Sequence, residues 1–250
     1  MHKIPTSLMC ILAAAGAAAL AFPPQGESAA PIAVSDGEPV LLELFTSQGC
    51  SSCPPADRLA ARLDQETGLV VVSRPVTYWD RLGWKDTLAS EDNTTLQRQY
   101  ARKGLSGHNG VYTPQMVVDG TIGVVGSQER AVKQSINAAR QADSAAIRAK
   151  RNSDGSAAVG LGGKAERLAE LVLLKIASRA DVAIGRGENA GRKITYVNVL
   201  RSERVLGSWE GGALSMRIEP STLQGDNADR FALVLREPDA GKVLAASWIS

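Results

Sequence analysis

The sequence predicts an α/β domain followed by a mainly-β, antiparallel sandwich-like domain. Residues 39–148 alternate between short apolar runs, typical of strands, and stretches with apolar residues at helical spacing. The composition shifts near residue 150, and β-like runs separated by Gly, Asn and Asp follow. We therefore predict a leader over residues 1–30, a first domain over 36–150 and a second domain over 151–250.

The first domain is predicted from the order of its elements. Gly68 ends the first helix, and Asp119-Gly120 between two short apolar runs is a strong hairpin signal. The order βαβ, α, ββα is that of a thioredoxin-like domain. The expected elements are strand 40–45, helix 56–65, strand 69–79, helix 93–103, strands 116–118 and 122–125, and a helix from 127 to about 150.

The second domain is predicted from turn-forming residues that separate short β-like runs. A turn-rich linker at 151–156 precedes it, and short runs rich in β-branched and aliphatic residues recur to the end of the chain. These features indicate a small antiparallel sandwich or barrel. The expected strands are 157–161, 169–176, 180–185, 193–205, 207–210, 212–218, 231–237 and 243–249.

The composition and the N-terminal residues indicate where the protein is located and which partners it lacks. The formal net charge of +2 over 250 residues is too small to predict nucleic acid or an anionic membrane as a partner. Residues 1–30 combine a short basic start, an apolar core over 8–20 and a polar, Pro-rich exit, as in a secretory signal peptide. We expect a periplasmic or secreted protein with no stable membrane span after cleavage; the alternative is an uncleaved N-terminal anchor.

The cysteines carry the main functional prediction. Of the three, Cys10 lies in the leader, which leaves Cys50 and Cys53 in one C-x-x-C between an apolar strand and a helix. A disulfide that closes so small a loop constrains the unfolded chain little, so stabilisation of the fold is a weak explanation for this pair of cysteines. A helix N-terminus lowers a thiol pKa, so we expect Cys50 to be the nucleophile and Cys53 the resolving thiol.

Three further residues complete the predicted catalytic site. Thr113-Pro114 stands directly before the hairpin, where we expect a cis peptide bond beside the disulfide; an ordinary trans proline is the alternative. Glu43 interrupts the strand that leads into Cys50. Its carboxylate is expected either to carry protons for Cys53 or to lie at an edge or in a salt bridge.

Aromatic residues near the cysteines have two interpretations. Tyr78, Trp79, Trp84 and Tyr112 either line a substrate groove beside the dithiol or pack the core of the domain. His108 is the only histidine beyond the leader, which excludes a multi-histidine metal site and favours a loop residue without a role. No sequence feature indicates a haem, flavin or nucleotide, so we predict no cofactor.

These motifs together resemble a known family. The runs Leu42–Asp57, Tyr78–Asp86 and Tyr112–Gln115 are similar to the secreted proteins of domain-of-unknown-function family 1223. The resemblance spans roughly 39–245 and implies a thioredoxin-like fold and a redox-type motif, but no substrate. Members often carry His-Val-Asp ahead of Tyr-Trp-Asp, and Pro75-Val76-Thr77 stand there in this chain.

Three functions are consistent with these sequence features. We expect an exported thiol–disulfide oxidoreductase that acts on protein or peptide thiols and disulfides with an unknown redox partner. The second is a copper-binding protein or metallochaperone that uses Cys50, Cys53 and Met116, because Cu(I) prefers thiolate and thioether ligands. The third is a binding module without turnover.

Overall fold

Strands dominate the structure, a computed structural model that describes residues 33, 38–107, 110–140 and 144–250. Strand accounts for 41% and helix for 19% of it. The helices are α1 (Pro54–Leu63), η1 (Asp80–Leu82), α2 (Glu91–Arg102), α3 (Glu129–Ala139) and η2 (Pro220–Leu223). The strands are β1 (Val40–Thr46), β2 (Leu69–Pro75), β3 (Gln115–Val118), β4 (Ile122–Val125), β5 (Ala145–Arg151), β6 (Ala157–Gly163), β7 (Ala169–Ala183), β8 (Lys193–Trp209), β9 (Leu214–Ile218), β10 (Arg230–Arg236) and β11 (Val243–Trp248).

One mixed sheet joins the two halves of the chain. Its eight strands lie in the order β11-β10-β7-β8-β2-β1-β3-β4, and a second sheet of three strands has the order β5-β6-β9. β1 pairs with β2 and β2 with β8 in parallel, the latter at Ser73 and Val199. The predicted fold class, an α/β thioredoxin-like domain followed by an antiparallel sandwich-like domain, is therefore wrong. Strands from both halves alternate in one sheet because β8 pairs beside β2; the boundary near residue 150 stays a prediction.

A second correction concerns the helix predicted to reach residue 150. Helix α3 ends at Ala139, and β5 begins at Ala145. The first three residues of β5, 145–147, are buried, and beyond them the exposed side chains of Arg148 and Lys150 alternate with half-buried Ala149, as in a strand with one buried face. Alanine and lysine, both common in helices, concealed that alternation in the sequence.

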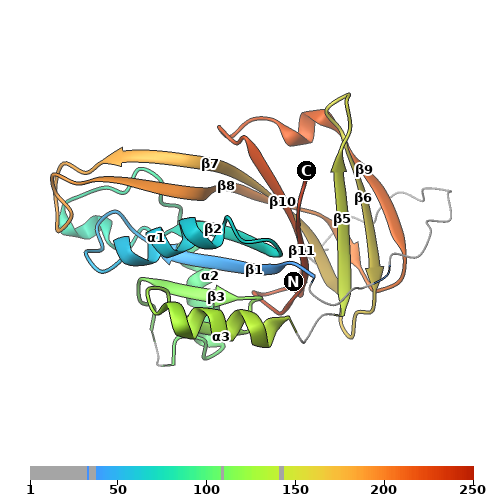
Figure 1. Ribbon diagram of the computed structural model, residues 1–250, viewed down its shortest axis with the longest axis horizontal. Helices are drawn as coiled ribbons and strands as arrows, with labels where there is room; N and C mark the ends of the chain where they lie inside the picture. Colours follow the sequence, from blue (N-terminus) through green and yellow to red (C-terminus); the bar gives the residue numbers. More distant parts are fainter. Residues whose placement is uncertain (1–32, 34–37, 108–109, 141–143) are drawn as a thin grey trace, which may run out of the picture.

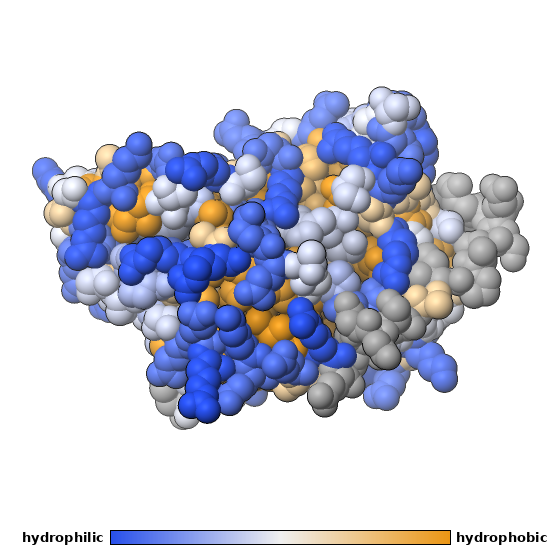
Figure 2. All heavy atoms as spheres, viewed as in Figure 1, coloured by the Kyte–Doolittle hydropathy of each residue, from blue (hydrophilic) through white to orange (hydrophobic). Residues whose placement is uncertain are grey.

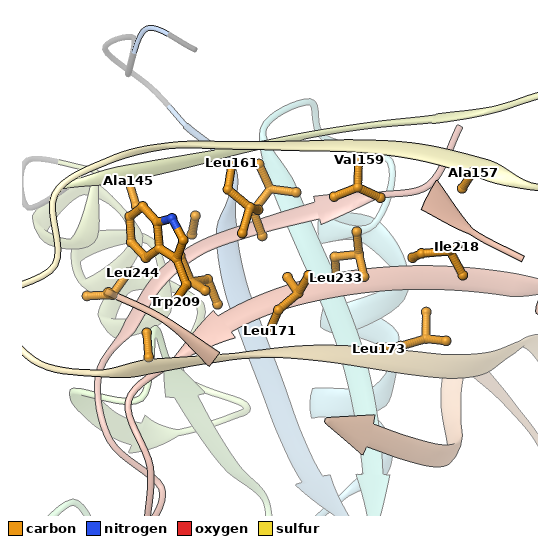
Figure 3. Close-up of a cluster of buried hydrophobic side chains, with 14 of the residues drawn as sticks. Ala145, Ala157, Val159, Leu161, Leu171, Leu173, Trp209, Ile218, Leu233 and Leu244 are labelled. Carbon is orange, nitrogen blue, oxygen red and sulfur yellow. The ribbon is translucent and has the colours of Figure 1, made fainter. Parts of the chain in front are cut away.

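The three-stranded sheet packs on the C-terminal part of the large sheet (Figure 1). Val159 and Leu161 of β6 face Leu171 of β7 and Leu233 of β10, with Trp209 beside them (Figure 3). All five side chains are at most 3% exposed. This sandwich supplies one of the large apolar cores of the protein.

The opposite face of the same strands packs on β1 and β2. Leu41 and Val70 share a buried cluster with Leu174 of β7 and Val234 of β10. The indole nitrogen of Trp248, on β11, donates to the carbonyl of Leu69 at 3.1 Å. The large sheet therefore folds back on itself, and β11 lies against the first two strands.

Helices cover the remaining faces of β1 and β3. Leu42 and Leu44 of β1 pack under α1 and α3, whereas Phe45 packs on the other face with Tyr100 of α2. Hydrophilic side chains cover most of the face drawn in Figure 2, and hydrophobic ones show only in separate patches between them. This arrangement places the N-terminal end of α1, where Cys53 lies, at the edge of the molecule (Figure 1).

We predict that Leu171→Ala lowers the free energy of unfolding by about 3 kcal/mol, because it opens a cavity between two closely packed sheets. Leu168→Ala is the matched control, since Leu168 is 43% exposed and its truncation is expected to cost less than about 0.5 kcal/mol. Urea unfolding of the two variants measures the difference. Equal destabilisation would contradict the packing described for this core.

Candidate functional site

A disulfide joins Cys50 and Cys53 at the start of α1. Their Cα atoms are 5.4 Å apart, and Cys53 is the N-cap of the helix, with Pro54 following it. Proline suits that position because the first turn of a helix has no partner for its N–H. Both cysteines are 0% exposed, yet Ser51 and Ser52 between them are exposed. The sulfurs thus lie just beneath the surface.

Side chains from the loop after β2 hold the segment that leads into the disulfide. The backbone N–H of Gln48 donates to Asp86 at 2.8 Å, and the Trp84 indole donates to the Gln48 side chain at 2.9 Å. A Cβ on Gly49 would lie 3.2 Å from the Cβ of Trp79, so glycine allows this close approach. The tryptophans therefore flank the disulfide loop.

Thr113 and Pro114 lie on the same side of the molecule as the disulfide loop. Their peptide bond is cis, as predicted. The Trp79 indole donates to the Thr113 hydroxyl at 2.9 Å, so Trp79 touches both Gly49 and Thr113. Phe45 pairs with Gln115, which places Pro114 beside Thr46 at the end of β1. Thr46 is four residues before Cys50 in the sequence. The structure thus brings Thr113 and Pro114 close to the disulfide loop.

The four aromatic candidates divide into two groups. Trp79 and Trp84 contact the disulfide loop, as described above. Tyr78 packs with the cluster of α2, and the Tyr112 carbonyl accepts from Gln97 of α2 at 2.7 Å. All four are half-buried, so each combines packing with partial exposure.

Glu43, expected either to carry protons for Cys53 or to lie at an edge or in a salt bridge, lies on the face of β1 opposite α1. Leu42 and Leu44 face α1, so the Glu43 side chain points to the opposite face of β1. There it binds Arg74 and Arg236, each at 2.7 Å, and accepts a hydrogen bond from Tyr100 at 2.6 Å. Burial opposes its ionisation, but the charges of both arginines and the Tyr100 hydroxyl outweigh burial and lower the pKa of Glu43 to about 2. The salt-bridge alternative is the one that the structure has.

Asp57 is a candidate that the sequence analysis missed. It lies one turn after Cys53 on α1, and its backbone N–H donates to the Cys53 carbonyl at 3.1 Å. Its Oδ1 accepts from Thr46 at 2.7 Å, while its Oδ2 is buried and has no partner within the described part of the chain. Burial raises the pKa of Asp57 to about 7, opposed by Thr46 and reinforced by the charge of Asp86. The aspartate four residues after the cysteine was the only sequence signal for it.

The turn between β7 and β8 is the second element that the sequence analysis missed. We call residues 184–192 the hairpin tip. The side chain of Asn189 donates to the carbonyls of Gln48 and Cys50, both at 2.9 Å, and the Ser51 N–H donates to Glu188 at 3.2 Å. The hairpin tip, which is separated from the cysteines by nearly 140 residues in the sequence, therefore contacts the disulfide loop.

Met116 does not accompany the cysteines as a third ligand. It is buried in the apolar cluster with Leu42, Leu44 and the residues of α1 and α3. Among the residues that the structure describes, no group of three or more His, Cys, Asp and Glu side chains is arranged to hold a metal ion. His108 and the predicted leader lie outside the described residues.

Fold and site together define a mostly-β protein with a Cys-x-x-Cys disulfide at a helix N-terminus. The chain belongs to the family described as a protein of unknown function, DUF1223, whose model matches residues 41–236. No curated protein matches the chain.

Two solved structures are similar to it. A protein from Agrobacterium tumefaciens, solved by a structural genomics consortium, is 28% identical with a TM-score of 0.73, over 84% of this chain and 93% of that one. HBP35 of Porphyromonas gingivalis is 12% identical with a TM-score of 0.54, over 86% of this chain and 76% of that one, and this likeness concerns the fold alone. Within the described part of this chain, none of the helices has the length and apolar character needed to cross a membrane.

We predict that Glu43→Gln lowers the free energy of unfolding by about 3–5 kcal/mol at pH 7, because it takes the carboxylate of Glu43 from buried Arg236 and leaves buried Arg74 with the carboxylate of Glu203 alone. The pKa of Glu43 is lower in the folded state, so its contribution is present above about pH 4.5 and is lost as pH falls toward 2. Urea unfolding at several pH values should therefore show this loss in the parent protein and not in the variant. Glu129→Gln, which breaks exposed pairs with Arg62 and Lys133, is the control and should leave the free energy of unfolding close to that of the parent protein.

Proposed function

We propose that this protein is an exported thiol–disulfide oxidoreductase acting on protein or peptide thiols. One observation carries the proposal: Cys50 and Cys53 form a disulfide at the N-terminus of α1, with the buried carboxyl group of Asp57 one turn further on. A helix N-terminus favours a thiolate, and a carboxyl group with a pKa of about 7 exchanges protons at neutral pH. The signal-like sequence of residues 1–30 supports export.

The reaction begins from the reduced pair. The Cys50 thiolate attacks a substrate disulfide, forms a mixed disulfide and displaces one substrate thiolate. Cys53 then loses its proton to Asp57, and its thiolate attacks the Cys50 sulfur. The second substrate thiolate leaves as the Cys50–Cys53 disulfide forms. The substrate disulfide gains two electrons and the protein dithiol loses them; the reverse sequence oxidises a substrate dithiol.

Asp57 suits the second step because of its surroundings. Arg58 and Asp86 are the charged groups that act on it, and the hydroxyl of Tyr196 from β8 is buried near it without a partner among the described residues. Burial raises the pKa of Tyr196, and the charge of Asp57 raises it further, so the hydroxyl stays protonated. Tyr196 is therefore an uncharged neighbour of Asp57 while Cys53 loses its proton.

We predict that Cys50→Ser abolishes disulfide exchange with a reduced or oxidised polypeptide substrate such as insulin, because it removes the thiolate that attacks the substrate and forms the mixed disulfide. Turnover and the unfolding midpoint are measured together, and the midpoint of Cys50→Ser should match that of the reduced parent protein. Cys53→Ser is the companion variant, and it should accumulate mixed disulfides that are seen by non-reducing electrophoresis. Full turnover in Cys50→Ser would end the proposal.

We also predict that Asp57→Asn slows the second step near neutral pH. With reduced protein and dithionitrobenzoate, the second release of thionitrobenzoate reports attack by Cys53. In the parent this rate should rise with pH through about 7, since Asp57 must be ionised to accept the proton. In Asp57→Asn the rise should move toward about 8.5, the pKa of a free thiol. Glu66→Gln, an exposed carboxylate beyond α1, should leave the profile unchanged.

A further inference from the structure

The disulfide is close to the surface but is covered. Cys50 and Cys53 have 0% exposure, while the two serines between them are exposed. A thiol must reach a sulfur atom along the S–S axis in order to react with it. Something must therefore move before the disulfide exchanges with any partner, and the contacts of the hairpin tip indicate which part moves.

Asn189 is the main contact of the tip. It is fully buried, and its amide nitrogen donates to the carbonyls of Gln48 and Cys50 at 2.9 Å. Its amide oxygen accepts from Arg192 at 3.0 Å, which fixes the orientation of the side chain. Both hydrogens of one amide are thus used on the backbone of the disulfide loop.

Two further contacts complete the cover. Glu188 accepts the N–H of Ser51, the residue that follows Cys50. Gly185 lies against the ring of Trp84, because a Cβ added there would be 3.1 Å from the ring. The tip therefore contacts both the disulfide loop and one of the tryptophans that flank it.

The contacts that hold the hairpin tip against the disulfide loop are local and mostly polar. Strands β7 and β8 pair from Ala169–Trp209 to Ala183–Lys193, so the arms of the hairpin are held along their length. In the tip itself, only Ile184 and Asn189 are buried. Lifting the tip exposes little apolar surface and leaves the large cores untouched.

We propose that the hairpin tip is a cover that a thiol or disulfide must displace before it reaches the Cys50–Cys53 sulfurs, with Asn189 as the positioning residue that fastens it. The inference rests on the proposed function for its biological purpose. Displacement frees the Gln48 carbonyl and the Ser51 N–H and leaves the Cys50 carbonyl with only the N–H of Cys53, and these are groups that the backbone of a polypeptide substrate can satisfy. The cover thereby links access to the disulfide to the arrival of a partner that replaces its hydrogen bonds.

The test measures access without turnover. The oxidised protein is treated with dithiothreitol, and the second-order rate of reduction is followed by trapping the released thiols. Asn189→Ala should raise this rate about tenfold, the effect of losing two ordinary hydrogen bonds from the closed form. Glu188→Gln, an exposed change that keeps the fold, should raise it about twofold. Arg186→Ala, on the exposed side of the same tip, is the matched control and should react like the parent.

Low concentrations of urea separate local from global opening. Reduction through the lifted tip should depend weakly on urea, because little surface is exposed, whereas reduction through the unfolded state follows the full slope of unfolding. The proposal is overturned by unchanged rates in both tip variants, by an equal increase in Arg186→Ala, or by the full urea slope. Because dithiothreitol is the only reactant, these outcomes are distinct from loss of polypeptide turnover in Cys50→Ser, which tests the proposed function.

Discussion

The buried carboxylate of Glu43 is the interaction on which the arrangement of the strands depends. It binds Arg74 of β2 and Arg236 of β10, residues 31 and 193 positions away. Arg74 continues the network to Glu203 of β8. Charges removed from water are costly unless each finds a partner, so these four strands must come together in one arrangement. That constraint explains why the two halves of the chain share one sheet.

The shared sheet is also what assembles the site. Cys50, Cys53 and Asp57 come from the first β-α unit, whereas Tyr196 and the hairpin tip come from β8 and the turn before it. β8 carries the tip toward the end of β1 because it pairs in parallel with β2, at Ser73. The second half of the chain therefore controls the surroundings of a motif that lies wholly in the first half.

Local signals in the sequence predicted much of the first half. The apolar run into Cys50, the helix after Pro54 and the hairpin at Asp119-Gly120 all appear in the structure where periodicity and turn chemistry indicated them. Strand order is set by contacts between distant residues, and so the single large sheet was not predictable from these patterns. The same holds for the site: Asn189 lies in a Gly-rich turn typical of a solvated loop, and the burial of Asp57 depends on packing against β8.

The position of β11 has a consequence for the order of events during synthesis. Trp248 bonds to the backbone of Leu69, and Val243 donates to the carbonyl of Asp119 beside β1. The earliest strands thus lack their final neighbours until the last strand of the sheet has left the ribosome. The contacts of β11 therefore form only after the rest of the large sheet has been made, and Cys50 and Cys53 are made long before the hairpin tip.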